Sequence, residues 1–107
     1  MKKTLNFEVL IDENHLPLNI EMHSSDGAAK ETEIKALMIS AWAAKTKETL
    51  RIDLWTKDMP VNDMFIMYHQ TMMAMATSLQ KATENQKLAD ALRDYCDFFA
   101  EQTKIKG

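Results

Sequence analysis

The chain of 107 residues is poor in cysteine, glycine and proline, with one cysteine and two each of the other two. With Cys96 as the only thiol, a disulfide within the chain and a zinc site of several thiolates are both excluded. The two glycines, Gly27 and Gly107, stand far apart. The chain therefore has neither a glycine-rich phosphate loop nor the central glycine of a calcium-binding loop.

Basic clusters and long apolar runs are also missing. The chain has 13 basic and 16 acidic residues, and its Lys and Arg form no block, so we expect no nucleic-acid binding. No apolar run approaches the ~20 residues of a membrane helix. Glu8 and Asp12 interrupt the stretch that would have to be apolar in a signal peptide. We therefore expect a cytoplasmic protein without membrane insertion.

Short alternating segments occupy the first half of the chain. Residues 4–24 alternate between apolar and polar around a polar turn, which predicts an antiparallel β-hairpin. Residues 49–56 alternate as well and predict a strand, and Pro60 ends the extended run because it has no N–H to give to a sheet.

The segment 28–44 fits two interpretations. Its apolar residues have helical spacing, at Ile34, Leu37, Met38, Ala41 and Trp42. The same segment also alternates with period two and is compatible with a buried strand. We favour the helix because Ala and Met are good helix formers, and the strand remains the alternative.

Two helices are predicted after Pro60, over residues 60–82 and 85–104, from their apolar stripes. Thr83 and Gln86 have the spacing of a capping box at the start of the second helix. With 46% hydrophobic residues, the chain can form one core, so residues 1–107 are expected to be a single α+β domain. We expect a small antiparallel sheet of three or four strands with the C-terminal helices packed on one face.

No catalytic or metal-binding constellation is visible. His15, His23 and His69 are widely separated, and Cys96 is remote from all three, so they do not have the spacing of zinc ligands. Cys96 lies on an apolar helical stripe and is expected to pack as a small hydrophobic residue. The sequence therefore predicts no catalytic residue, no cofactor and no metal site.

Two groups of residues form a candidate interaction surface. Arg51, Asp53 and Trp55 share the strand face opposite Leu50 and Ile52, and tryptophan and arginine are residues that anchor interfaces. The alternative is that Arg51 merely pairs with Asp53 or with a cross-strand carboxylate and that Trp55 packs under a helix end. The second group lies off the apolar stripe of the first helix and consists of Ile66, Met67 and Met73.

The central motif runs from Thr49 to Met64 and reads Thr-Leu-Arg-Ile-Asp-Leu-Trp-Thr-Lys-Asp-Met-Pro-Val-Asn-Asp-Met. On this motif the chain resembles the gliding motility-associated protein GldC family. The flanking segments that extend the resemblance are 35–38, 69–71, 82–83 and 94–101. The chain departs from the family pattern at Ala43-Ala44, where an aspartate is expected, and this concerns only the following turn.

The resemblance implies a small cytoplasmic accessory protein of bacterial gliding, without enzymatic activity or cofactor. We therefore expect a non-catalytic protein that contacts partners in the gliding machinery, with a homodimer through the outer sheet face as a further possibility. The alternative is a binding module for a small apolar ligand, in a cavity between sheet and helices lined by Met64, Met72 and Met75. An enzyme would require His69 or His23 to meet Asp53 in one cleft.

Overall fold

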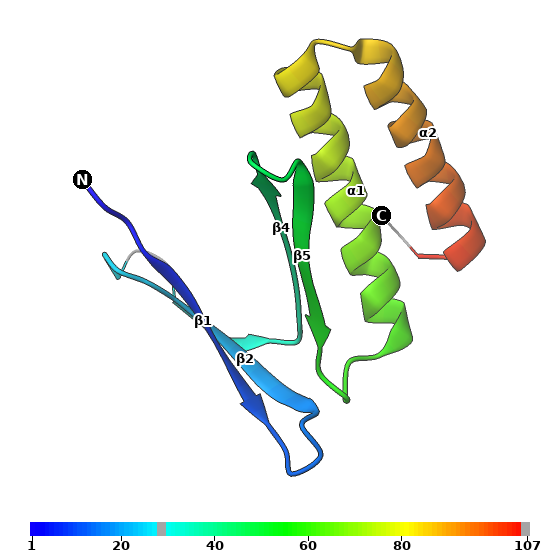
Figure 1. The fold of residues 1–107 in the computed structure, drawn as a ribbon. Coiled ribbons are helices and arrows are strands. Elements are labelled where there is room, and N and C mark those ends of the chain that lie inside the picture. The colour runs from blue at the N-terminus through cyan, green and yellow to red at the C-terminus, as the bar shows by residue number, and fades with distance from the viewer. Residues whose placement is uncertain (28–29, 106–107) are drawn as a thin grey trace. The chain divides into compact units, whose positions relative to one another are not determined.

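The computed structural model describes residues 1–27 and 30–105. The described residues form five strands followed by two helices, which confirms the α+β class (Figure 1). The chain divides into two compact units, Met1–Met59 with the strands and Pro60–Gly107 with the helices. That the units form a single domain, with the helices covering one face of a sheet, stays a prediction.

The first sheet contains three antiparallel strands in the order β1 (Leu5–Ile11), β2 (Pro17–Ser24) and β3 (Lys30–Ile34). Strands β1 and β2 form the hairpin predicted over 4–24. On one face Val9 lies opposite Ile20, and Ile20 lies opposite Ile34. Ile20 is 0% exposed and is the centre of the apolar face of this sheet.

The turn between β1 and β2 is organised by Asp12. Its carboxylate accepts hydrogen bonds from the N–H groups of Asn14 (2.8 Å) and Leu16 (3.0 Å). His15 adopts a left-handed conformation with φ of 64°. The register shifts between Leu10 and Ile11, at the edge of this turn. The turn therefore fixes which residues of β1 and β2 face each other, because loop geometry sets hairpin register.

The second sheet pairs β4 (Ala36–Ala43) with β5 (Glu48–Trp55) in antiparallel fashion. The helix favoured for 28–44 is therefore wrong: residues 30–43 form β3 and β4 with only Lys35 between them, and residues 28–29 lie outside the described part. Cross-strand contacts between apolar side chains outweigh the helix preference of Ala and Met. The pairs are Leu37–Leu54, Ile39–Ile52 and Ala41–Leu50.

The residues that follow β5 are tied to the link between β3 and β4 and to the start of β2. The Thr56 N–H donates to the Lys35 carbonyl (2.8 Å), and the Lys57 N–H donates to the Pro17 carbonyl (3.2 Å). The Lys57 ammonium also pairs with Asp12 at 2.9 Å. This hydrogen bond is the main reason why the pKa of Asp12 lies below its ordinary value of 3.8. These contacts hold the β1–β2 turn beside Trp55.

The second unit is a helical hairpin of α1 (Val61–Thr83) and α2 (Gln86–Thr103). Glu84, with φ of 58°, ends α1, and Asn85 caps α2 by accepting a hydrogen bond from the Leu88 N–H at 3.1 Å. The expected capping box is wrong because α1 continues through Thr83, whose hydroxyl donates to the Leu79 carbonyl of the same helix. Neither described helix is both long and apolar enough to cross a membrane.

The helices pack through small and aromatic side chains. Ala76 of α1 and Ala89 and Cys96 of α2 are 0% exposed. Phe99 of α2 contacts Phe65 edge to face and stacks on His69, with centroid distances of 6.0 and 6.5 Å. The contact uses Phe65 and Ala76 of the apolar stripe of α1. Other members of that stripe stay exposed, namely Val61, Tyr68 and Met75.

Candidate functional site

Strand β5 places Arg51, Asp53 and Trp55 on one face, as the alternation predicted. The cross-strand register adds residues of β4 to this face, because Ser40 lies opposite Arg51 and Met38 lies opposite Asp53. We refer to the whole set as the tryptophan face of the β4–β5 sheet. Its members are Met38, Ser40, Trp42, Arg51, Asp53 and Trp55.

The centre of the tryptophan face is a closed polar network. Arg51 donates hydrogen bonds to Asp53 and to Ser40, each at 2.5 Å. The Arg51 and Asp53 side chains are 47% and 41% exposed. An ion pair in this setting stabilises a fold by only about 0.2–1 kcal/mol. The pair therefore matters mainly because it neutralises its own charge and fixes the guanidinium in place.

The two tryptophans flank this network and remain accessible. Trp42 is 66% exposed and Trp55 is 56% exposed. Trp42 lies six positions along β4 from Ala36, the residue opposite Trp55, so the two side chains leave the sheet about 20 Å apart at ~3.3 Å per strand residue. Trp42 was missed from the sequence because the helical interpretation separated it from Trp55.

A shallow hollow of about 220 Å³ adjoins the tryptophan face. It is lined by Leu16 of the β1–β2 turn, by Pro17 at the start of β2 and by Asp53, Leu54 and Trp55 of β5. Four of the five lining residues are apolar, and Asp53 is the one polar residue. The hollow can receive an aliphatic side chain beside the Trp55 indole.

The other three predicted surface residues belong to α1, in the second unit. Ile66 and Met67 are half-buried, and Met73 is 38% exposed. Ile66 and Met73 are two helical turns apart and share one side of the helix, while Met67 lies about 100° around it. The structure thus gathers Arg51, Asp53 and Trp55 on one face and distributes the remaining candidates over a separate element.

Residues 17–105 match the model of a family described as gliding motility-associated protein GldC-like. The chain belongs to this GldC-like family. The match includes the whole tryptophan face and both helices, whereas β1 precedes it. Neither a curated protein nor a solved structure matches the chain.

The helical unit of this GldC-like chain carries its own apolar hollow. A volume of about 340 Å³ lies open at the surface between Met75, Ser78, Leu79 and Ala82 of α1 and Leu92 of α2. Only Met75 belongs to the methionines predicted to line a ligand cavity. A cavity for an apolar ligand between sheet and helices stays a prediction.

The single thiol of the GldC-like chain is embedded in its helical hairpin. Cys96 is 0% exposed. Burial, assisted by the nearby charge of Asp97, raises the pKa of the Cys96 thiol above its ordinary value of 9.0. A buried thiol that stays protonated is a poor nucleophile, so Cys96 packs as a small hydrophobic residue.

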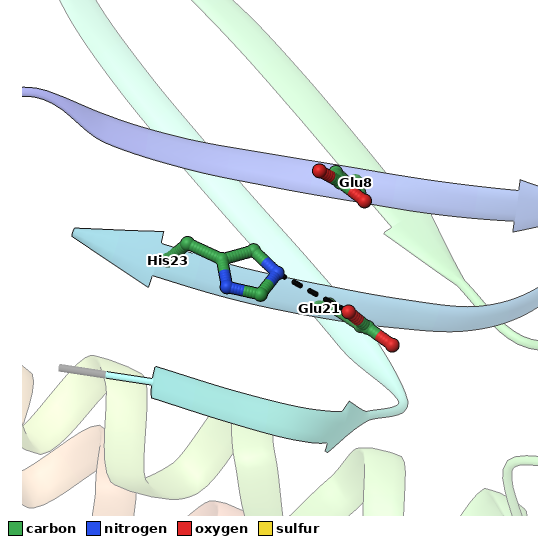
Figure 2. Close-up of side chains that lie close together, drawn as sticks. All are labelled: Glu8, Glu21 and His23. Carbon is green, nitrogen blue, oxygen red and sulfur yellow. Dashed lines mark hydrogen bonds and ion pairs between the residues drawn. The ribbon is translucent and has the colours of Figure 1, made fainter. Parts of the chain in front are cut away.

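Histidine and carboxylate side chains meet at a place that the sequence did not indicate. Glu8 of β1 and Glu21 and His23 of β2 gather on one face of the three-stranded sheet (Figure 2). Among the described residues, the hollow at Asp53 is lined by no histidine. These three residues come together because of the register of the β1–β2 hairpin. Sequence spacing alone does not reveal this register.

Proposed function

We propose that this GldC-like chain is a non-catalytic, cytoplasmic accessory protein of the gliding machinery that binds a protein partner through its tryptophan face. Family membership supports the process, and the surface supports the molecular role. The observation that carries the proposal is the pair of exposed indoles of Trp42 and Trp55 on either side of the closed Arg51–Asp53 pair.

The dimensions of the tryptophan face suit a protein interface. Each partner contributes about 800 Å² to an interface of standard size, which corresponds to a patch about 30 Å across. The two indoles, about 20 Å apart at ~3.3 Å per strand residue, fit within one such patch. Tryptophan and arginine are the most frequent energetic anchors of interfaces, and both are present on this face.

The chemistry of the face defines the partner. Because Arg51 is already paired with Asp53, the face carries little unbalanced charge at its centre, and charge attraction is not its main binding force. The hollow beside Trp55 accepts an aliphatic side chain. The partner is therefore a protein surface with a protruding apolar residue, surrounded by groups that hydrogen-bond to Asp53 and Arg51.

Capture of the tagged full-length chain from a gliding bacterium, with quantitative identification of bound proteins, tests this proposal. The variant Trp55→Ala should lose the specific partner, while the matched control Met73→Glu, which changes an exposed residue on α1, should keep it. Loss with Met73→Glu and retention with Trp55→Ala would instead place the interface on the helix. Unchanged capture by both variants, with normal gliding, would overturn the surface assignment.

A second copy of the chain is an outcome that the same experiment distinguishes. Light scattering of the purified protein gives its mass, and a two-fold dimer through the tryptophan face should become monomeric in the double variant Trp42→Ala/Trp55→Ala. A dimer that this double variant does not dissociate would be formed elsewhere. In that case the tryptophan face remains available to another protein.

A further inference from the structure

The face of the three-stranded sheet that carries Glu8 holds three potential metal ligands. Glu8 of β1 lies directly opposite Glu21 of β2, and His23 follows two residues along β2 on the same face. One donor atom from each of the three side chains lies within 4.8 Å of the other two. Figure 2 shows the imidazole and the two carboxylates on this face, with His23 hydrogen-bonded to Glu21.

The two carboxylates are not neutralised within the described residues. Like charges directly opposite each other destabilise a sheet, and no Lys or Arg of residues 1–27 and 30–105 forms an ion pair with Glu8 or Glu21. Lys30 lies opposite His23 on β3 but is not paired with either carboxylate. Among the described residues, the one other ionisable side chain in contact with these carboxylates is His23, whose Nε2 lies 3.2 Å from Glu21 Oε1. The two carboxylates are therefore available to bind a cation.

A hollow adjoins the two carboxylates on the side of Asn19, away from His23, and leaves both of them accessible. It has a volume of about 220 Å³ and is lined by Glu8, Leu10, Asn19 and Glu21. The Asn19 amide nitrogen donates to the Thr32 carbonyl at 2.7 Å. This hydrogen bond ties the Asn19 side chain to β3.

We propose that Glu8, Glu21 and His23 bind one divalent transition-metal cation of the zinc or manganese class. One imidazole and two carboxylates suit these ions, whereas calcium and magnesium prefer oxygen ligands alone. Ligands about 2.1 Å from zinc stand about 3.4 Å apart in a tetrahedral site. The accessible glutamates reach this spacing by side-chain rotation, while the paired strands keep their positions. The ion then replaces the hydrogen bond between His23 and Glu21 and clamps β1 to β2.

Titration of the metal-free, full-length chain with zinc chloride, by calorimetry and by thermal melting, tests the site. The wild type should bind one ion per chain and melt at a higher temperature, and EDTA should reverse the shift. Even removal of a group that only supports a metal ligand weakens binding about 10–100-fold. The ligand variants His23→Gln and Glu8→Gln should therefore weaken zinc binding at least about tenfold.

The control His15→Gln makes the same change in the β1–β2 turn and should leave zinc affinity unchanged. The variant Lys30→Met removes the neighbouring cation and should tighten binding. Equal affinities of wild type, His23→Gln and Glu8→Gln, or no zinc-dependent shift in the wild type, would overturn the proposal.

A second measurement keeps the test decisive if His23→Gln folds poorly. Without metal, Glu8→Gln should melt at a higher temperature than the wild type, because it removes the repulsion with Glu21. Adding zinc should then raise the melting temperature of the wild type but not that of Glu8→Gln. A zinc-dependent rise of the same size in Glu8→Gln would show that the ion binds elsewhere and would refute the assignment.

Discussion

The two sheets of the first unit use apolar residues in different ways. The three-stranded sheet has a fully buried centre at Ile20, and its opposite face carries polar side chains such as Glu8 and Glu21. The β4–β5 sheet contains no fully buried side chain and exposes large apolar residues on both faces. Leu50 and Ile52 are exposed on one face, and Trp42 and Trp55 on the other.

This difference gives the three-stranded sheet a stabilising role and leaves the β4–β5 sheet for binding. A two-stranded ribbon is marginal by itself, and the β4–β5 sheet is joined to the rest of its unit through the backbone contacts of Thr56 and Lys57. The exposed apolar side chains of the β4–β5 sheet contribute little to the stability of the fold. They are therefore available to a partner, while the three-stranded sheet supplies the core.

The largest expected effect contrasts the two sheets directly. Ile20→Ala should lower the free energy of unfolding by about 2–5 kcal/mol, because it removes buried methylene groups and leaves a cavity. Leu50→Ala, at a position that is 58% exposed, should cost about 0.5 kcal/mol. Urea denaturation measures both. Similar losses from the two variants would show that the sheets share one equally buried core.

A smaller effect is expected on the polar face of the three-stranded sheet. Glu8→Gln should stabilise the metal-free chain by about 0.2–1 kcal/mol, because a neutral amide replaces one of two opposed charges. The matched control Glu13→Gln, an exposed position in the following turn, should change little. Urea denaturation in the presence of EDTA measures the difference, and a loss of stability in Glu8→Gln would contradict the assigned repulsion.

Acid should weaken the connection between the two sheets. The pKa of Asp12 is lowered from 3.8, mainly by Lys57, and that of Asp58 is lowered, mainly by the Thr56 hydroxyl. A carboxyl with a lowered folded-state pKa stabilises the fold above its unfolded pKa, and this stabilisation is lost as pH falls through the lowered value. Stability should therefore decline as pH drops below 3.8.

The variant Lys57→Met isolates the contribution of Asp12 to this decline. Without the ammonium, the pKa of Asp12 rises toward its ordinary value, so the acid-dependent loss of stability should be smaller than in the wild type. Asp94→Asn, which removes an exposed charge on α2, serves as the control variant. Urea midpoints measured across the acid range compare the three proteins. Identical profiles for Lys57→Met and the wild type would contradict the role of this ion pair.

The smallest effect on stability is expected for the largest side chains. Trp42→Ala and Trp55→Ala should each change the free energy of unfolding by no more than about 0.5 kcal/mol, because both indoles are mainly exposed. Their effect on partner binding should be much larger, since anchor residues contribute about 2 kcal/mol or more. Urea denaturation combined with partner affinity separates these roles, and a strong loss of stability would assign Trp55 to the core.

The hairpin 4–24, the strand near 49–56 and the two helices followed from local periodicity, because each repeats its pattern over several residues. The segment 28–44 did not, because Leu37 and Ala41 satisfy both a helical spacing and a two-residue alternation. Only pairing with β5, a contact outside the local window, decides between them. Lys35 separates β3 from β4 without a glycine or proline to mark the break.

For the candidate site, too, local alternation predicted the residues of one strand but not their neighbours on the next strand. Alternation in β5 placed Arg51, Asp53 and Trp55 together, whereas Trp42 required the register of β4 against β5. The meeting of Glu8 with Glu21 and His23 required the register of another hairpin, which depends on the turn at Asp12 and the shift after Leu10. Faces of one strand can be read from sequence, while cross-strand neighbours depend on turn geometry.

The order of the elements has a consequence for the speed of folding. Each described pairing of strands, β1–β2, β2–β3 and β4–β5, and the helical pair α1–α2 joins elements that are neighbours in the chain. Such local topology gives a low contact order, and chains of this kind fold within about milliseconds. Contacts within each hairpin should form first, because its two elements are joined by a short connection. Contacts between distant residues, such as Lys57 with Asp12 across 45 positions, should close last and set the observed rate.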